Sequence, residues 1–145
     1  MGRILKVFFV MILIALIGIQ FIDVERTNPV VTADLKAPVA IKELFIKSCY
    51  DCHSNQTEWP WYSYVAPVSW LVANDVAEGR KHLNFSDWEK LPGRKKEELK
   101  KEIWEEVRND KMPMTIYTYT HPEAKLDFTQ KNLIKQWATG NGFLN

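Results

Sequence analysis

The chain has 145 residues, of which 46% are hydrophobic and 26% charged, and its net charge is +1. This composition excludes an intrinsically disordered chain, because the apolar side chains suffice for a core. The balanced charge excludes the strongly basic surface on which nucleic-acid binding depends, so we expect no nucleic acid among its partners. The length allows one domain and a short leader.

The N-terminal segment has a basic, then apolar, then acidic order. Arg3 and Lys6 precede an apolar run at residues 7–22, and two acidic side chains close it. A helix over this run and the two apolar residues before it is just long enough to span a membrane with its N-terminus inside. We therefore predict a signal anchor or signal peptide at residues 1–22 and a linker at 23–36.

Two fates are open for the N-terminal segment. A cleaved signal peptide needs small residues soon after its apolar stretch, and none occur there. Val31-Thr32-Ala33 has suitable residues but lies about ten positions too far along the chain. We favour an uncleaved anchor in a bacterial inner membrane, with the remaining domain facing the periplasm. The alternative is a soluble periplasmic protein released by cleavage at Ala33.

The remaining domain, residues 37–145, has the periodicity of an all-α fold. Apolar residues recur at helical spacing over four stretches, at 37–48, 66–79, 94–109 and 127–139. Gly79 is expected to cap the second helix, and Gly140 with Gly142 to end the last. Capping-box patterns begin at Ser86, ahead of a short helical turn, and at Asp127. Two long proline-bearing loops, at 54–65 and 111–126, are typical of functional segments.

Cys49-Tyr50-Asp51-Cys52-His53 is a C-x-x-C-H sequence, the attachment motif of c-type haem. Two intervening residues let one helical turn present both sulfurs to the two vinyl groups of haem. His53 then reaches the iron as an axial ligand. A closed zinc site needs four ligands, and a thioredoxin-like pair needs a βαβ context, which the sequence lacks. We therefore predict one covalently bound haem c on Cys49, Cys52 and His53.

Met112-Pro113-Met114 is the candidate source of the second axial ligand. A thioether opposite His binds haem iron and raises its potential. Pro113 biases Met112 toward an extended backbone, which favours Met112 as the ligand over Met114, the runner-up. The alternatives are that both methionines fill gaps in the core, or that the sixth position is open.

His82 and His121 are weaker candidates for the iron. His82 follows Gly79-Arg80-Lys81 and is expected to be exposed or capping. His121 is expected to fix its loop or to hydrogen-bond a haem propionate. The aromatic run Trp59-Pro60-Trp61-Tyr62-Ser63-Tyr64 has two readings that remain open, a cover over the haem disc and an ordinary core.

Taken together, several motifs resemble the bacterial haem-binding domain family of small c-type cytochromes. The resemblance runs from Ala37 to Trp137. It rests on Cys49 to Asn55, Trp59 to Tyr62, Pro67 to Leu71, Gly79-Arg80, Asn84-Phe85-Ser86, Met112-Pro113 and His121 to Leu126. The family tends to have Met-Pro-Pro, whereas Met114 stands at the third position here. The resemblance implies a cytochrome c-like helical fold and haem binding, and it carries no reaction.

We therefore expect an all-α, cytochrome c-like domain in which the first and last helices cross beside the haem. The expected function is one-electron transfer between redox partner proteins, with the inner membrane as a further partner. An electron carrier is favoured over an enzyme. The alternative is a peroxidase-like or gas-binding enzyme or sensor with an exchangeable distal ligand. A module that supports a larger membrane complex is a third reading.

Overall fold

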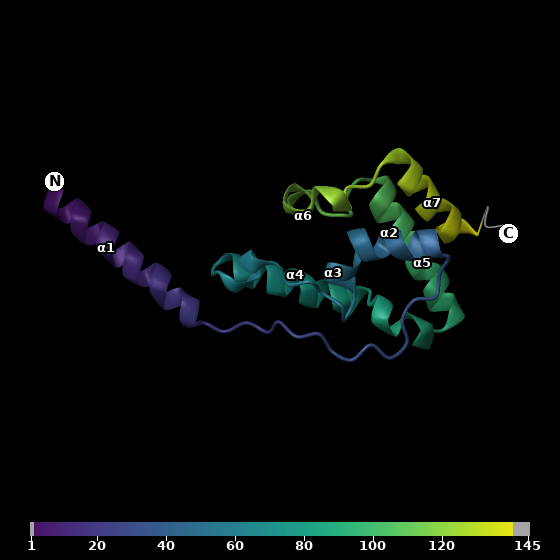
Figure 1. Cartoon of the computed structure of the whole chain (residues 1–145), viewed down its shortest axis with the longest axis horizontal. Helices are drawn as coiled ribbons and strands as arrows, with labels where there is room; N and C mark the ends of the chain where they lie inside the picture. The colour runs from purple at the N-terminus through teal and green to yellow at the C-terminus, as the bar shows by residue number, and fades with distance from the viewer. Residues whose placement is uncertain (1, 141–145) are drawn as a thin grey trace.

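The computed structural model describes residues 2–140, and every regular element in that range is helical. The predicted all-α class is therefore confirmed. Gly142, which was expected to help end the last helix, lies outside the described residues. Figure 1 shows a helical domain from which one N-terminal helix projects.

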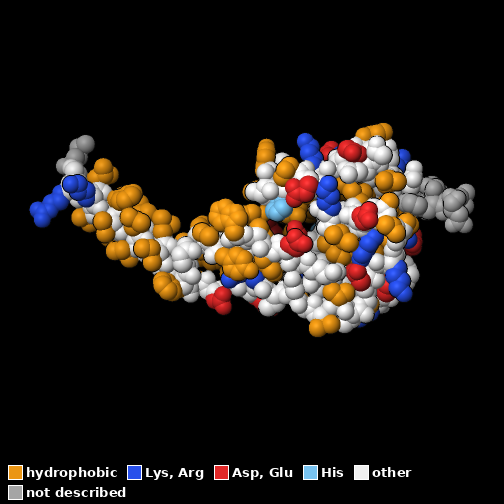
Figure 2. Space-filling view, viewed as in Figure 1, with side chains coloured by type: hydrophobic (Ala, Val, Ile, Leu, Met, Phe, Trp, Pro, Cys, Tyr) orange, Lys and Arg blue, Asp and Glu red, His pale blue; other side chains and the backbone are white. Residues whose placement is uncertain are grey.

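The projecting helix is apolar except for Arg3 and Lys6 near its start and Gln20 near its end. Helix α1 (Gly2–Gly18) continues into the 3-10 turn η1 (Ile19–Phe21), and none of these residues is buried. Figure 2 shows hydrophobic side chains all along it. The 20 residues from Gly2 to Phe21 are long and apolar enough to cross a membrane. A signal sequence has the same length and apolar composition. The predicted N-terminal apolar segment is thus confirmed as a helix of the kind that forms either an anchor or a signal sequence.

The segment after η1 runs in extended form along the domain rather than away from it (Figure 1). Two of its backbone amides, Ala33 N and Leu35 N, donate to Ser86 O at 3.0 Å and to Phe85 O at 2.9 Å. Leu35 is buried in the core. The second half of the predicted linker is thus part of the folded domain.

The core lies between α2 (Val39–Ser48), α5 (Gly93–Arg108) and α7 (Phe128–Thr139), where α7 contacts both other helices. Aromatic rings fill it. Phe45 stacks on Phe85 with ring centroids 5.1 Å apart, and it meets Trp137 edge-on at 5.0 Å. Such pairs add to the stabilisation that burial itself provides.

Two arms extend from this core on the same side (Figure 1). The first is α4 (Val68–His82), which follows the 3-10 turn η2 (Trp61–Tyr64) and packs against α3 (Tyr50–His53). The second is α6 (Thr115–Thr120) with the 3-10 turn η4 (Pro122–Ala124). The two segments predicted as loops therefore contain helical turns of their own.

The helix ends test the caps that were predicted from the sequence. The capping box at Asp127 and Gln130 is confirmed, with both reciprocal hydrogen bonds at 2.8 Å. The predicted cap at Gly79 is wrong, because α4 continues to His82. The predicted cap at Ser86 is also wrong. The 3-10 turn η3 (Phe85–Lys90) is capped by Asn84, whose side chain accepts from Ser86 N at 3.0 Å.

Candidate functional site

The predicted site residues line three adjoining cavities of about 270, 90 and 530 Å³, the last of which is within the size range of ligand sites. Cys49, Cys52, His53, Met112 and Met114 all line the first. Cys49, His53 and Met112 also line the second, and Cys52 and Met114 the third. The fold thus brings the C-x-x-C-H segment and the methionine loop together across one hollow.

The two cysteines lie where α2 ends and α3 begins. Cys49 is the residue between the helices, and its carbonyl accepts from His53 N at 2.9 Å, which closes the single turn of α3. Both cysteines are free thiols. Burial raises the pKa of Cys49 to about 12 and that of Cys52 to about 11, so both stay protonated at neutral pH.

His53 is oriented by two backbone carbonyls. Its Nδ1 lies 3.0 Å from Gly79 O and 3.2 Å from Leu83 O. Both partners only accept, so Nδ1 carries the proton and Nε2 carries the lone pair. Burial lowers the pKa of His53, which favours this neutral form. A metal-ligating histidine is normally held in this way, with one ring nitrogen donating to a carbonyl and the other left for the metal.

Gly79 allows α4 to approach the motif closely. A Cβ at this position would lie 2.5 Å from Cys52 O, closer than real Cβ atoms come, and 3.1 Å from Cys52 C, which is also a tight contact. The absence of a side chain therefore sets the spacing between α3 and α4. That spacing also brings Gly79 O to His53. Sequence reasoning assigned this glycine to a helix end and missed its role, because only the folded contact reveals it.

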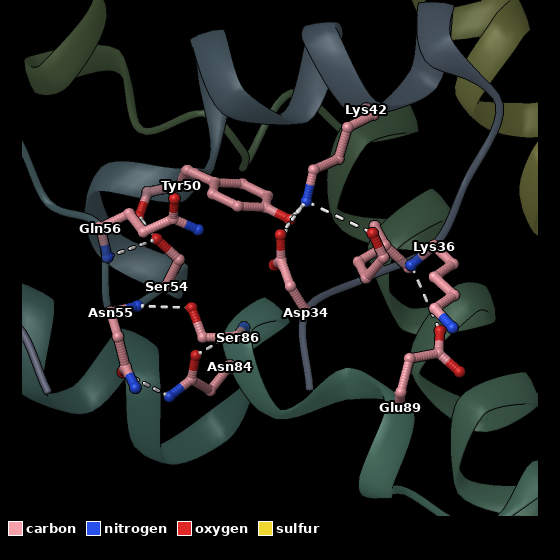
Figure 3. A network of polar contacts seen from close by, with 11 residues as sticks. Asp34, Lys36, Lys42, Tyr50, Ser54, Asn55, Gln56, Asn84, Ser86 and Glu89 are labelled. Carbon is pink, nitrogen blue, oxygen red and sulfur yellow. Dashed lines mark hydrogen bonds and ion pairs between the residues drawn. The ribbon is translucent and has the colours of Figure 1, made fainter. Parts of the chain in front are cut away.

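A polar network anchors the start of the motif to the extended segment (Figure 3). The Tyr50 hydroxyl donates to Asp34 Oδ1 at 2.9 Å, and Lys42 Nζ contacts both side chains. Burial, followed by the bond to Asp34, raises the pKa of Tyr50 well above its usual value. Tyr50 therefore remains a neutral hydrogen-bond donor. Its hydroxyl connects α3 to Lys42 on α2 and to Asp34 in the extended segment.

A second set of bonds fixes the residues that follow His53 (Figure 3). Ser54 Oγ donates to Tyr50 O at 2.7 Å, and Asn55 N donates to Ser86 Oγ at 2.9 Å. Asn84 Nδ2 donates to Asn55 Oδ1 at 2.8 Å. Ser54, Asn55 and Ser86 are buried. The turn after the motif is thus held rigidly against η3.

The methionine loop is turned back toward the motif at the end of α5. Glu106 O accepts from both Lys111 N and Met112 N, at 3.0 and 3.2 Å, and Asp110 takes a left-handed φ of 56°. Beyond the loop, the Tyr117 hydroxyl donates to Asp51 Oδ2 at 2.7 Å and so ties α6 to α3. These contacts place the loop opposite the motif.

The two remaining histidines lie at the edges of the cavities. The His82 side chain is 71% exposed, and its Nε2 lies 3.3 Å from Glu102. His121 stacks on Tyr117 with centroids 4.3 Å apart, and its Nδ1 lies 3.1 Å from Thr120 Oγ1. His121 also lines the third cavity. It is thus held within its own loop.

The aromatic run has no single role. Trp61 is 79% exposed, which excludes it from the core. Tyr62 lines the third cavity, and its hydroxyl lies 3.2 Å from Thr120 Oγ1 on α6. The Trp59 Nε1 is buried and has no hydrogen-bond partner among the described residues. Only Tyr62 and Trp61 of this run's four aromatic residues line the hollow.

The charged lining of the cavities is acidic. Among the described residues that line the three cavities there is no Lys or Arg, whereas six carboxylates do so: Asp51, Glu58, Asp75, Glu78, Glu102 and Glu106. Burial raises the pKa of Asp75. The buried Ser48 Oγ lines the first two cavities and has no partner among the described residues, as expected for an atom beside a bound group.

The residues present fit an iron-bearing cofactor better than a bare ion. No cluster of three or more His, Cys, Asp or Glu suited to a metal ion occurs in the described part of the chain. The first cavity instead combines the His53 imidazole, whose Nε2 is free, with two thioethers and two thiols in a mostly apolar lining. A family model described as a haem-binding domain matches residues 14–140. No curated protein and no solved structure gave a significant match.

Proposed function

The chain belongs to the haem-binding domain family, and from this we propose that it is a membrane-anchored c-type cytochrome that carries single electrons. Haem binding follows from the family. Covalent attachment, the iron ligands and electron transfer are our proposal. One observation carries it: the C-x-x-C-H segment and the methionine loop line the same hollow, with His53 held so that Nε2 is free.

The cysteines are suited to covalent attachment of one haem. Cys49 and Cys52 are one helical turn apart, recessed and protonated. Each S–H would add across one vinyl double bond of the haem, so that a C–S bond would form and the thiol hydrogen would pass to the neighbouring vinyl carbon. This addition involves no net oxidation, so no further reactant is needed. A disulfide between these cysteines would compete with it.

His53 and Met112 are proposed to hold the iron. Among the two methionines, Met112 shares both the first and the second cavity with His53, whereas Met114 shares only the first. This favours Met112, with Met114 as runner-up. When bound, haem supplies one-electron exchange between ferric and ferrous iron. The chain's residues orient and shield that centre, and none is proposed to make or break a substrate bond.

The anchoring helix determines where the carrier works. Two basic residues, Arg3 and Lys6, stand at the free end of α1, which favours a cytoplasmic N-terminus. The haem domain then lies on the periplasmic face of a bacterial inner membrane, where its redox partners would be other proteins. Cleavage at Ala33 is disfavoured, because Ala33 N and O both pair with η3.

The carrier function is tested by a matched pair of variants. Met112→Ala should lower the midpoint potential, because a thioether ligand favours ferrous iron, and it should open the iron to rapid CO binding. Met114→Ala should leave six-coordinate iron that binds CO slowly. The reverse pattern would identify Met114 as the iron ligand, and the proposed electron-carrier function would still stand. Rapid CO binding by the unmodified protein would contradict the carrier and favour the enzyme or sensor.

A further inference from the structure

The corner where η2 meets α4 exposes apolar side chains next to the end of the anchoring helix. Trp61, Tyr64, Val65, Val68 and Leu71 are between 41% and 79% exposed, and we call these five residues the corner patch. Trp61, Val68 and Leu71 all line the third cavity, so they belong to one region of the surface. Contiguous exposed apolar residues of this kind mark an interaction surface.

The corner patch is attached directly to the end of α1–η1. Gln20 Nε2 donates to Ala66 O at 3.0 Å, and Ala66 N donates to Gln20 Oε1 at 3.0 Å, so one side chain satisfies both backbone groups of Ala66. Arg26 Nη1 donates to Ser63 O at 3.3 Å, and the Arg26 guanidinium lies 4.7 Å from the centre of the Tyr64 ring. The corner is thus joined to the end of the helix by two hydrogen bonds between the Gln20 side chain and the Ala66 backbone.

We propose that the corner patch lies in the interfacial layer of the lipid bilayer, which holds the haem domain against the membrane. The proposal rests on α1 being the membrane anchor. The 20-residue apolar helix is about 30 Å long at 1.5 Å per residue, which matches the hydrocarbon core. Gln20 then stands at its outer boundary, and Ala66, bonded to Gln20, stands at the same depth.

The side chains of the corner patch suit that depth. Trp and Tyr are enriched at membrane–water interfaces, because a large apolar ring can be buried there while its polar atom stays hydrated. Figure 2 shows hydrophobic side chains along α1 and, after a short interruption, again on the end of the domain nearest to it. The third cavity, with Leu71 and Trp61 on its wall, then opens close to the lipid surface.

Site-directed spin labelling of the full-length holoprotein tests this proposal. With Cys49 and Cys52 bound to haem, Leu71→Cys supplies a single reactive thiol, and Phe128→Cys on α7 is the matched control, being 82% exposed. Each labelled protein is reconstituted at one chain per lipid nanodisc of phosphatidylcholine and phosphatidylglycerol. Accessibility to oxygen, which concentrates in lipid, is compared with accessibility to a water-soluble nickel complex.

We expect the oxygen-to-nickel ratio to be several-fold higher at Leu71 than at Phe128. Equal ratios, with the chain still in the nanodisc after a high-salt wash, would overturn the docking while the anchor stands. Low accessibility to both reagents at Leu71 would mean that protein, or the haem in the adjoining hollow, covers the patch, and either result would overturn the docking. Release of the chain by the wash would overturn the anchor and the docking together.

Discussion

Gly79→Ala is the most informative perturbation of the site, because it adds one methyl group at the contact between α4 and the C-x-x-C-H segment. The new Cβ would lie 2.5 Å from Cys52 O. The obstructing atom is backbone, so no side-chain rotation relieves the overlap, and α3 and α4 must separate. Forcing such a shift in a packed interior costs about 1–3 kcal/mol. Replacing Gly by Ala inside a helix stabilises the helix by about 0.5–1 kcal/mol, which offsets part of this cost.

The net loss should be about 1 kcal/mol, or a fall of about 4–8 °C in the melting temperature for a domain of this size. The separation should also lengthen the bond from His53 Nδ1 to Gly79 O, which is 3.0 Å in the native protein, and so change the ligand-sensitive visible spectrum. Gly93→Ala is the control, because Gly93 opens α5 and nothing lies within 4 Å of a Cβ there.

Melting followed by far-ultraviolet circular dichroism, together with visible spectra of the holoproteins, measures both effects. Gly93→Ala should melt at or slightly above the native temperature with an unchanged spectrum. If Gly79→Ala has the melting temperature and spectrum of Gly93→Ala, the contact between position 79 and Cys52 does not control the orientation of His53, and the prediction is wrong.

Further predictions concern the network that supports the motif and the last helix. Tyr50→Phe removes the 2.9 Å bond to Asp34 and should cost about 1–2 kcal/mol in denaturant unfolding. The raised pKa of buried Tyr50 keeps it neutral in the folded state, whereas tyrosine ionises near pH 10 when unfolded, so stability should fall as pH rises above about 10. That fall should be smaller in Tyr50→Phe, and an equal fall would contradict the assignment. Asp127→Ala should cost about 0.5–2 kcal/mol in melting experiments, since it removes the N-cap of α7, and no loss would show that the capping box is not needed.

The elements that local signals determine could be predicted from the sequence. The apolar periodicity of residues 94–109 and 127–139 gave two helices close to their observed bounds, because amphipathic faces are a property of the segment itself. The Asp127 capping box was predicted for the same reason, since its partners are three residues apart. The helical turns η2 and α6 were missed, because prolines and aromatic residues there resemble a loop.

Features that depend on distant contacts could not be predicted. Gly79 has the residue type of a helix cap, yet its position is decided by Cys52, which is 27 positions earlier. Ser86 has the residue type of an N-cap, but its hydroxyl is used by Asn55. The cysteines, His53 and the two methionines that line the first cavity were proposed from the sequence, because the motif marks three of them and the Met-Pro pair marks the loop. Their second contacts, to Gly79, Leu83 and Asp34, appear only in the fold.

The central claim is that Cys49 and Cys52 bind one haem covalently. Intact-mass spectrometry of the purified protein under acidic, denaturing conditions tests it most directly, because only a covalent group survives unfolding. We predict a mass equal to the polypeptide plus one haem for the native protein. The Cys49→Ala, Cys52→Ala variant, treated identically, should show the polypeptide mass alone. A native protein that releases its haem and appears at the polypeptide mass would contradict the account.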